Sequence, residues 1–145
     1  MLIKKLSAEE YPRALSLVWS VFLQYEAPDY PTQELKTFKS SITDVEYLDA
    51  LKMWGAYSAG RLVGVIALRN GGGHIALFFV DGTYHRRGIG RALFETALAN
   101  SAGDIITVNS SPYAIEIYRR LGFMPNGPEQ NTQGIRYTPM IYAKN

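Results

Sequence analysis

The chain has 145 residues, of which 47% are hydrophobic and 19% charged, and this balance is typical of one folded globular domain rather than of a disordered segment. Its 15 Lys and Arg against 13 Asp and Glu give a formal net charge of +2, a surplus too small to indicate nucleic-acid binding by itself. Because cysteine is absent, a disulfide framework, a thiolate metal site and a catalytic thiol are excluded.

The N-terminal residues lack the apolar core of a signal peptide, and no apolar run approaches the length of a membrane span. We therefore expect a cytoplasmic protein with no membrane partner, formed by a single domain over residues 1–145.

The first third of the chain predicts one strand followed by helices. The strand is expected over residues 2–6, two helices over 8–24 and 32–40, and a short third helix after them. Ser7 and Glu10 have the spacing of a capping box, in which each side chain satisfies a free backbone N–H of the other residue. Thr43 and Glu46 repeat this spacing, so Thr43 is expected to cap the third helix.

The remaining residues predict alternating strands and helices. Strands are expected over 54–58, 62–68, 74–80 and 105–108, near Phe123 and over 135–143, and helices over 88–102 and from Ser111 to Leu121. Ala59-Gly60-Arg61 predicts a hairpin between the first two of these strands. The nearly continuous apolar run 74–80 is typical of a strand covered on both faces. This order predicts an α/β (α+β) fold with a mixed central sheet of about six to seven strands flanked by helices.

The segment 80–91 combines the features of an anion-binding loop. A buried strand ends, a basic loop follows, and Gly88 and Gly90 open a helix. Backbone N–H groups at a helix start are unpaired, the helix dipole adds positive potential, and glycine allows phosphate oxygens to approach closely. Three arginines of the same segment add full charges: Arg86, Arg87 and Arg91.

Other readings of this glycine pair are weaker or less specific. A Walker phosphate loop is excluded because no Gly-Lys-Ser/Thr follows, and a dinucleotide fingerprint is disfavoured because its third glycine would fall on Leu93. The plainest alternative is that Gly88 and Gly90 only permit a tight turn between a strand and a helix.

Two motifs together resemble a known family. The segment with His85, Gly88 and Gly90 is similar to the acyl-CoA pyrophosphate loop of the GNAT superfamily of N-acetyltransferases, Gln/Arg-x-x-Gly-x-Gly/Ala, with His85 where Gln or Arg is usual. Residues 114–123, Ala-Ile-Glu-Ile-Tyr-Arg-Arg-Leu-Gly-Phe, resemble the Ala-x-x-x-Tyr-x-x-x-Gly-Phe helix and strand of the same family. The resemblance covers about the last two thirds of the chain and implies the acyl-CoA N-acyltransferase fold.

The resemblance also implies that acetyl-CoA is the co-substrate and that no metal is needed. Members of the family often carry Asn three residues before the motif alanine, where this chain has Ser111, with Asn109 two residues earlier. The strand before the loop splays from its neighbour in the family, so that freed backbone groups bind pantetheine and the Val80 N–H could donate to the thioester oxygen. The implied cofactor-binding residues are Phe79, Val80, His85, Arg86, Arg87, Gly88, Ile89, Gly90, Arg91, Asn109, Ser111 and Tyr118.

The resemblance implies direct attack of a neutral amine on the thioester, which requires a general acid and a general base. Tyr118 is the candidate acid because a tyrosine, with a pKa near 10, is protonated at neutral pH and can donate to a departing thiolate. His74, six residues before Val80, stands at a position that resembles the one where some histone-modifying family members place a glutamate base, and an unperturbed histidine titrates near pH 6.5, so it is the candidate base. Alternatively, Tyr118 is an ordinary core tyrosine and His74 a surface or structural residue.

Glu26 and Tyr30 lie between the first two predicted helices, in a region that borders the acceptor site in the family. Glu26 could bind an ammonium group or serve as an alternative base, whereas the simpler reading is a solvated loop. The acceptor itself stays open among small amines, amino acids, antibiotics, polyamines and protein amino groups, and the resemblance leaves a homodimer open.

Two rival functions have to be considered. A non-catalytic acyl-CoA-binding sensor could use the same fold, although the retained Tyr118 argues against it. A nucleotide- or nucleic-acid-binding module could use the arginines of the loop, and would bind polyanions without selectivity for coenzyme A. We expect no nucleic-acid partner, and a metal site is disfavoured by two widely separated histidines and no cysteine.

Overall fold

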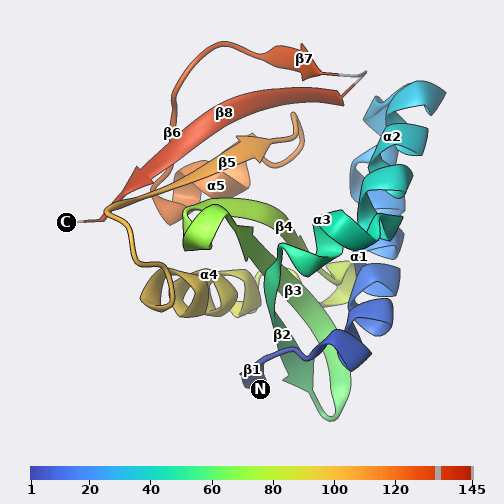
Figure 1. The fold of residues 1–145 in the computed structure, drawn as a ribbon, viewed down its shortest axis with the longest axis vertical. Coiled ribbons are helices and arrows are strands. Elements are labelled where there is room, and N and C mark those ends of the chain that lie inside the picture. The colour runs from blue at the N-terminus through green and yellow to red at the C-terminus, as the bar shows by residue number, and fades with distance from the viewer. Residues whose placement is uncertain (133–134, 145) are drawn as a thin grey trace.

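The computed structural model describes residues 1–132 and 135–144, which form one mixed sheet with helices on both faces (Figure 1). In chain order the strands and α-helices are β1 (Leu2–Lys5), α1 (Tyr11–Tyr25), α2 (Thr32–Thr43), α3 (Val45–Asp49), β2 (Lys52–Ser58), β3 (Arg61–Arg69), β4 (His74–Val80), α4 (Ile89–Ala99), β5 (Ile105–Ser110), α5 (Ile115–Leu121), β6 (Met124–Pro125), β7 (Gln130–Thr132) and β8 (Ile135–Ala143). Short 3-10 turns lie at Ala8–Glu10, Ala27–Asp29, Asn70–Gly72 and Gly82–Tyr84.

The sheet has the order β1-β2-β3-β4-β5-β8-β6, and β7 pairs with β8 beside this path. The β4–β5 pair is parallel, and the other described pairs are antiparallel. The expected mixed sheet flanked by helices is confirmed, with eight described strands because the polar segment Gln130–Thr132 forms a strand that hydrophobic patterning did not predict. The predicted hairpin is also confirmed, since Ala59 and Gly60 both have positive φ, as the favoured two-residue turn requires.

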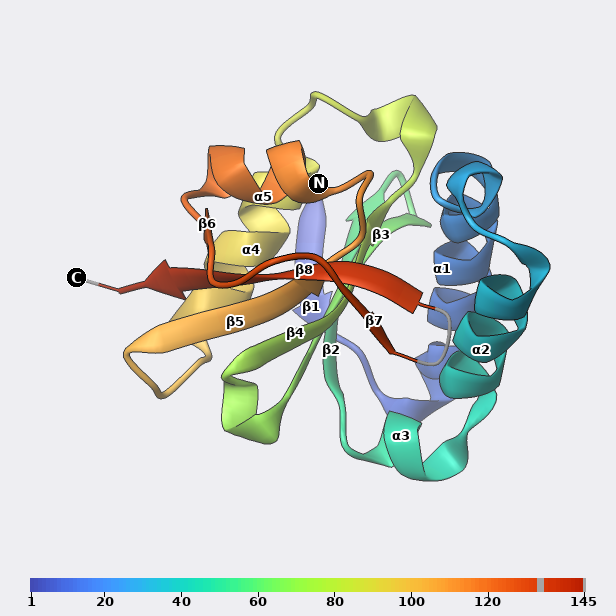
Figure 2. The same ribbon diagram turned by 90° about the horizontal axis from the view of Figure 1, so that it is seen from above.

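The helices divide between the two faces of the sheet (Figure 2). Helices α1, α2 and α3 lie on one face, whereas α4 and α5 lie on the other. Each face buries its own apolar cluster: Val18 and Phe22 of α1 pack with Leu77 of β4 on the first, and Leu93 of α4 packs with Ile66 of β3 on the second. Burial on both faces explains the unbroken apolar run of β4.

Several predicted helix ends differ from the structure. The third helix is capped by Asp44, whose carboxylate accepts from the amides of Glu46 and Tyr47. The predicted cap, Thr43, instead ends α2, and its hydroxyl donates to the Lys39 carbonyl. The prediction of Thr43 as the cap was wrong because the next residue, Asp44, carries a carboxylate that accepts from these backbone amides instead. The predicted capping box of Ser7 and Glu10 is confirmed, because the Ser7 amide donates to the Glu10 carboxylate and the reciprocal contact of the Ser7 side chain with the Glu10 amide is present.

The last two helices are shorter than predicted. Helix α4 ends at Ala99 rather than at residue 102, and α5 begins at Ile115 rather than at Ser111. Residues 111–114 form a turn in which the Ala114 amide donates to the Ser111 carbonyl, at 3.1 Å, and lies 3.3 Å from the Ser111 hydroxyl.

Strand β4 contains a bulge and leaves its parallel neighbour early. Pairing with β3 matches Ala67 to Leu77 and Leu68 to Ile75, so Ala76 is an extra residue without a register partner. As a result Ile75 and Leu77 pack on opposite faces of the sheet, although residues two apart in a regular strand share a face. Pairing with β5 is limited to His74 and Ile75, after which the two strands diverge.

Candidate active site

Two cavities meet at the C-terminal half of β4. One, of about 400 Å³, is bordered by β4, the loop after it and helix α5, and is called the loop cavity below. The other, of about 120 Å³, is enclosed by α1, α2, β4, β5 and β8, and is called the acidic pocket because Glu26 and Glu34 line it. The two cavities share five lining residues, Glu26, Phe78, Phe79, Ala114 and Tyr118. A molecule bound in one cavity would therefore meet a molecule bound in the other at this shared wall.

The backbone of β4 faces the opening between β4 and β5. The Asp81 amide donates to the Val63 carbonyl at 2.8 Å, so this residue points its amide toward β3. Successive residues of an antiparallel strand alternate in the direction of their N–H and C=O groups. The Val80 and Phe78 amides therefore point away from β3, toward the side where β5 has diverged.

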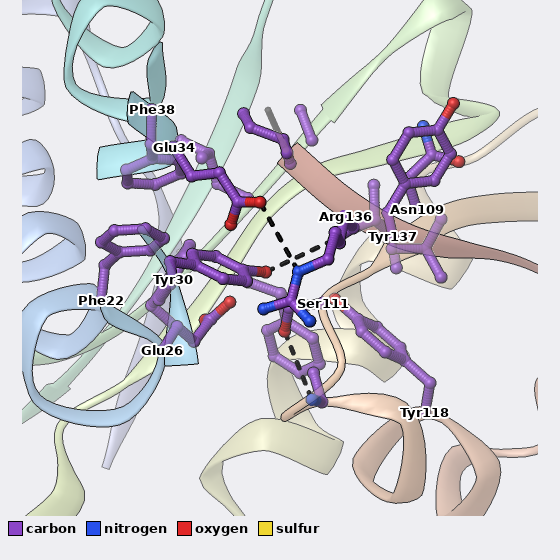
Figure 3. A pocket seen from close by; sticks show the side chains of 18 residues that line it. Phe22, Glu26, Tyr30, Glu34, Phe38, Asn109, Ser111, Tyr118, Arg136 and Tyr137 are labelled. Carbon is purple, nitrogen blue, oxygen red and sulfur yellow. Dashed lines mark hydrogen bonds and ion pairs between the residues drawn. The ribbon is translucent and has the colours of Figure 1, made fainter. Parts of the chain in front are cut away.

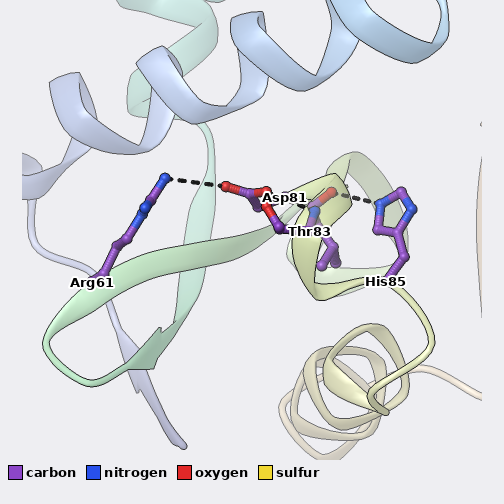
Figure 4. A network of polar contacts seen from close by, with 5 residues as sticks. Arg61, Asp81, Thr83 and His85 are labelled. Atoms are coloured by element: carbon purple, nitrogen blue, oxygen red, sulfur yellow. Dashed lines mark hydrogen bonds and ion pairs between the residues drawn. The ribbon is translucent and has the colours of Figure 1, made fainter.

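Hydrogen bonds fix the loop that follows β4 (Figure 4). The Asp81 carboxylate accepts from the Thr83 amide at 2.9 Å and lies 3.5 Å from the Arg61 guanidinium. Hydrogen bonds from Thr83 hold the pKa of Asp81 below its usual value, since they stabilise the ionised form. The His85 Nε2 lies 2.8 Å from the Val80 carbonyl, an acceptor, so Nε2 carries the proton and donates. The loop is thus tied to the end of β4 at several points.

Helix α4 begins directly behind this loop. Gly88 stands before its first residue with φ of 81°, and Arg86 has φ of 64°, so the chain passes through left-handed backbone twice within three residues. Only glycine adopts this conformation without strain, which supplies a physical reason for Gly88. The first amides of α4 have no partner within the helix and lie at the loop cavity, which Gly88, Ile89 and Gly90 line.

Positive charge gathers around the same cavity. Arg86, Arg91 and Arg120 line it, and the Arg91 side chain donates to the Arg120 carbonyl at 3.0 Å, which links α4 to α5. Arg120 was not among the residues selected from the sequence. Arg87 was selected, but its guanidinium lies 5.2 Å from the centre of the Tyr84 ring, and Arg87 is not among the described residues that line either cavity.

The acidic pocket combines carboxylates with aromatic rings (Figure 3). Glu26 follows the last turn of α1, and Glu34 projects from α2 toward Arg136 of β8, with 3.5 Å between Oε1 and Nε. The Tyr30 hydroxyl donates to the Arg136 carbonyl at 3.5 Å, and its ring lies 5.5 Å from the same guanidinium. Two elements from opposite ends of the chain therefore close the pocket.

The pKa values of both ionisable groups at the shared wall, Glu26 and Tyr118, are raised. Burial raises the pKa of Glu26 above its ordinary value, and the nearby Ser111 hydroxyl opposes this rise in part. Burial, and then the negative charge of Glu26, raise the pKa of Tyr118. Glu26 is therefore a stronger base than an exposed carboxylate once ionised, and Tyr118 keeps its proton at all ordinary pH values.

His74 lies elsewhere. It is buried at the first residue of β4, and its Nδ1 is 2.8 Å from the Thr107 hydroxyl of β5. Six strand residues, roughly 20 Å at about 3.3 Å per residue, separate it from Val80. His74 is not among the described residues that line either cavity. Burial, and secondarily the charge of Arg69, lower its pKa to about 4, so it is neutral at physiological pH.

The structure brings most of the sequence-predicted residues to one place. Glu26, Tyr30, Asn109, Ser111 and Tyr118 line the acidic pocket, while the loop cavity is lined by Phe79, Val80, His85, Arg86, Gly88, Ile89, Gly90 and Arg91. Sequence reasoning missed Glu34 and Arg136. Glu34 had a signal, because it precedes Phe38 and Ile42 by four and eight residues, and so is a carboxylate on the apolar face of α2.

Residues 1–132 and 135–144 contain neither a metal-binding cluster nor a membrane-spanning helix. No group of three or more His, Cys, Asp or Glu side chains in them is placed to hold a metal ion. None of their helices combines the length and the apolar character that crossing a membrane requires.

Comparisons with known proteins give a family match and several solved structures with a similar fold. A family model described as an acetyltransferase (GNAT) domain matches residues 26–144. Solved structures that are similar include a GCN5-related N-acetyltransferase from Rhodopseudomonas palustris, with 22% identity and a TM-score of 0.82 over 98% of this chain and 94% of that one. Apo YjaB from Escherichia coli has 18% identity and a TM-score of 0.78 over all of both chains. The PaiA N-acetyltransferase from Thermoplasma acidophilum, in complex with coenzyme A, has 16% identity and a TM-score of 0.69 over 98% of each. No curated protein sequence matches this chain.

The buried His74 predicts a dependence of stability on pH. Because its pKa is about 4 in the folded chain and about 6.5 when unfolded, the unfolded chain binds more protons between these values, and stability falls as pH decreases through that window. The unfolding free energy should lose on the order of 1 kcal/mol per pH unit from this residue. Chemical denaturation at pH 7.5, 6 and 5 should show a shallower loss in a His74→Gln variant. Equal slopes in the two proteins would contradict the assignment.

Proposed function

Because this chain belongs to the GNAT acetyltransferase family, as the match over residues 26–144 shows, it is an acyltransferase, and we propose that it moves an acetyl group from acetyl-CoA to a primary amine. The observation that carries this proposal is the shared wall of the two cavities, where Glu26 and Tyr118 stand between an anion-binding loop and an acidic pocket. A cytoplasmic location and a homodimer stay predictions.

The loop cavity is our candidate site for the coenzyme. Its phosphates would be held by the amides at the start of α4, with charge from Arg86 and Arg91, and its amide-containing arm by the backbone of β4 that faces away from β3. Acetyl-CoA supplies the acetyl group as a thioester. The Val80 N–H faces the same opening and is our candidate donor to the thioester oxygen.

The acidic pocket would hold the acceptor amine, and Glu26 is our candidate for its general base. Glu26 borders both cavities, and its raised pKa brings it closer to that of an effective base near neutral pH. His74, the base expected from the sequence, lines neither cavity and is nearly neutral above pH 5 with its Nδ1 occupied by Thr107. We therefore propose Glu26 in its place.

Tyr118 is our candidate general acid. In the proposed transfer the amine nitrogen forms a bond to the acetyl carbon, the carbon–sulfur bond breaks, Glu26 takes a proton from the nitrogen, and Tyr118 gives one to the departing sulfur. Tyr118 is buried and lines both cavities, and its raised pKa keeps the hydroxyl protonated. A non-catalytic acyl-CoA sensor is the alternative function. It would bind coenzyme A without needing a base or an acid at the shared wall.

Replacement of the base tests the proposed transfer directly. Acetyl-CoA and a panel of primary amines should give amine-dependent thiol release in the wild type, and Glu26→Gln should lower kcat/KM by about 10² or more. Glu26 must be ionised to act, and its raised pKa keeps it protonated to higher pH than an exposed glutamate, so wild-type activity should fall on the acid side above the usual carboxylate range. This acid limb should be missing from the variant.

The control is Glu95→Gln, which removes an exposed carboxylate of α4 that lines neither cavity. Binding of coenzyme A with no amine-dependent thiol release would favour the sensor. An acid limb that survives in Glu26→Gln and disappears in His74→Gln would return the role of base to the histidine.

Removal of the Tyr118 hydroxyl should affect turnover more than binding. In Tyr118→Phe we expect kcat to fall by at least about tenfold, because the departing sulfur loses its proton donor, while the ring keeps its packing against Phe78 and Phe123. Steady-state thiol release measures kcat, and calorimetric titration with coenzyme A measures binding. Tyr142→Phe is the matched control, because the partly buried Tyr142 ring packs against the core at Phe94 and lines neither cavity. Unchanged turnover in Tyr118→Phe would remove the residue from catalysis.

A further inference from the structure

Glu34 is a buried carboxylate that the proposed transfer does not use. Its side chain is 2% exposed, and Oε1 lies 3.5 Å from the Arg136 Nε. The other oxygen, Oε2, is buried and has no hydrogen-bond partner within residues 1–132 and 135–144. A buried carboxylate oxygen without a donor costs considerable free energy, so such an atom is normally paired. Because Glu34 lines the acidic pocket, a donor on the bound acceptor can supply the missing hydrogen bond.

The position of Glu34 in the fold supports a role in binding. It occupies the apolar face of α2, in line with Phe38 and Ile42, where a hydrophobic residue would stabilise the core without the cost of burying a charge. Its carboxylate points from α2 into the pocket toward Arg136 (Figure 3). The ion pair with Arg136 holds Oε1 and thereby fixes the direction of Oε2.

The charges of the pocket favour a cation. Its described lining carries two carboxyl groups, Glu26 and Glu34, and one guanidinium, Arg136. The two carboxyl groups also occupy different places: Glu26 lies at the wall shared with the loop cavity, whereas Glu34 does not line the loop cavity. The pocket therefore offers one acidic group beside the reacting position and a second acidic group away from it.

The walls between the two acidic groups suit a short apolar chain. Phe22 and Phe38 are stacked with 3.9 Å between ring centres, and the Tyr30 ring lies 5.8 Å from Phe22. Such rings contact methylene groups favourably, and their faces attract cations. The volume of the acidic pocket is about 120 Å³, against about 400 Å³ for the loop cavity, which suits a small acceptor.

We propose that the acceptor is a small aliphatic diamine, with one nitrogen at Glu26 and the second, as an ammonium group, bound to Oε2 of Glu34. This inference rests on the proposed function and adds the substrate class to it. Glu34 acts here as a specificity-determining residue: it selects amines that carry a second cationic nitrogen and does not take part in the transfer itself. An amino acid, whose carboxylate would bind Arg136, is the competing acceptor that the experiment distinguishes.

The experiment compares straight-chain diamines of two to six carbons with monoamines of equal chain length and with free amino acids, by thiol release from acetyl-CoA. At least one diamine should exceed its matched monoamine by about tenfold or more in kcat/KM, as one charge-assisted hydrogen bond would give. In Glu34→Gln this ratio should fall below about threefold, mainly through KM, whereas Glu95→Gln should keep it. The Arg136 side chain is 36% exposed, so water can reach its guanidinium when Glu34 loses its charge.

A binding measurement separates this inference from the proposed function. The best diamine is titrated calorimetrically into protein saturated with coenzyme A, where no transfer occurs, and Glu34→Gln should weaken its binding by about tenfold or more. Retained coenzyme A binding and an unchanged thermal melt show that the variant is folded. If the Glu34→Gln variant does not fold, the wild-type ratio of kcat/KM for the diamine to that for the monoamine alone tests the inference.

Equal use of diamines and monoamines, a preference that survives Glu34→Gln, or a preference for amino acids that Arg136→Gln removes would each overturn the diamine assignment while leaving amine acetylation intact. Diamine binding through Glu34 without any thiol release would instead refute the proposed transfer and keep the site.

Discussion

Strand β4 has two hydrogen-bonding edges, and only the edge toward β3 is paired along its length. Pairing with β5 stops after His74 and Ile75, and the bulge at Ala76 changes which side chains face each side of the sheet. Backbone amides inside a protein need partners, so an opened parallel pair creates a slot with donors and acceptors already in place. The proposed coenzyme arm would complete this slot as an extra strand would. The loop fixed by Asp81 and His85 places the start of α4 at the end of the same slot.

The divergence of β4 and β5 also explains why groups from distant parts of the chain meet. On one face of the sheet, the end of α1 contributes Glu26 and α2 contributes Glu34, while α5 on the other face contributes Tyr118. In an unbroken sheet these two sets of side chains would be separated by paired backbone. At the opening Glu26 and Tyr118 line a common wall, which is why we propose them as the base and the acid of one transfer.

The parts that sequence could predict are those governed by local rules. The apolar run 74–80 gave β4 its correct bounds, and the glycine at residue 88 matched a left-handed backbone position before α4. The cap of α3 could not be decided from motif spacing, because the adjacent residues Thr43 and Asp44 both have side chains that can cap a helix. Whether His74 lies near the cavities depends on where β4 separates from β5. The bulge in β4 and its short pairing with β5 set that point, and both belong to the tertiary fold. Glu34 and Arg136 meet only after β8 has returned beside α2, so their ion pair requires the tertiary fold.

We propose that coenzyme A binds to the backbone edge of β4 that β5 leaves open. Hydrogen exchange of individual amides, followed by NMR with and without saturating coenzyme A, tests it most directly. The Phe78 and Val80 amides, which point away from β3, should exchange more slowly when coenzyme A is present. The Leu77 and Phe79 amides, which point toward β3, should change less. Unchanged exchange at Phe78 and Val80 in a chain saturated with coenzyme A would show that the coenzyme does not bind this edge.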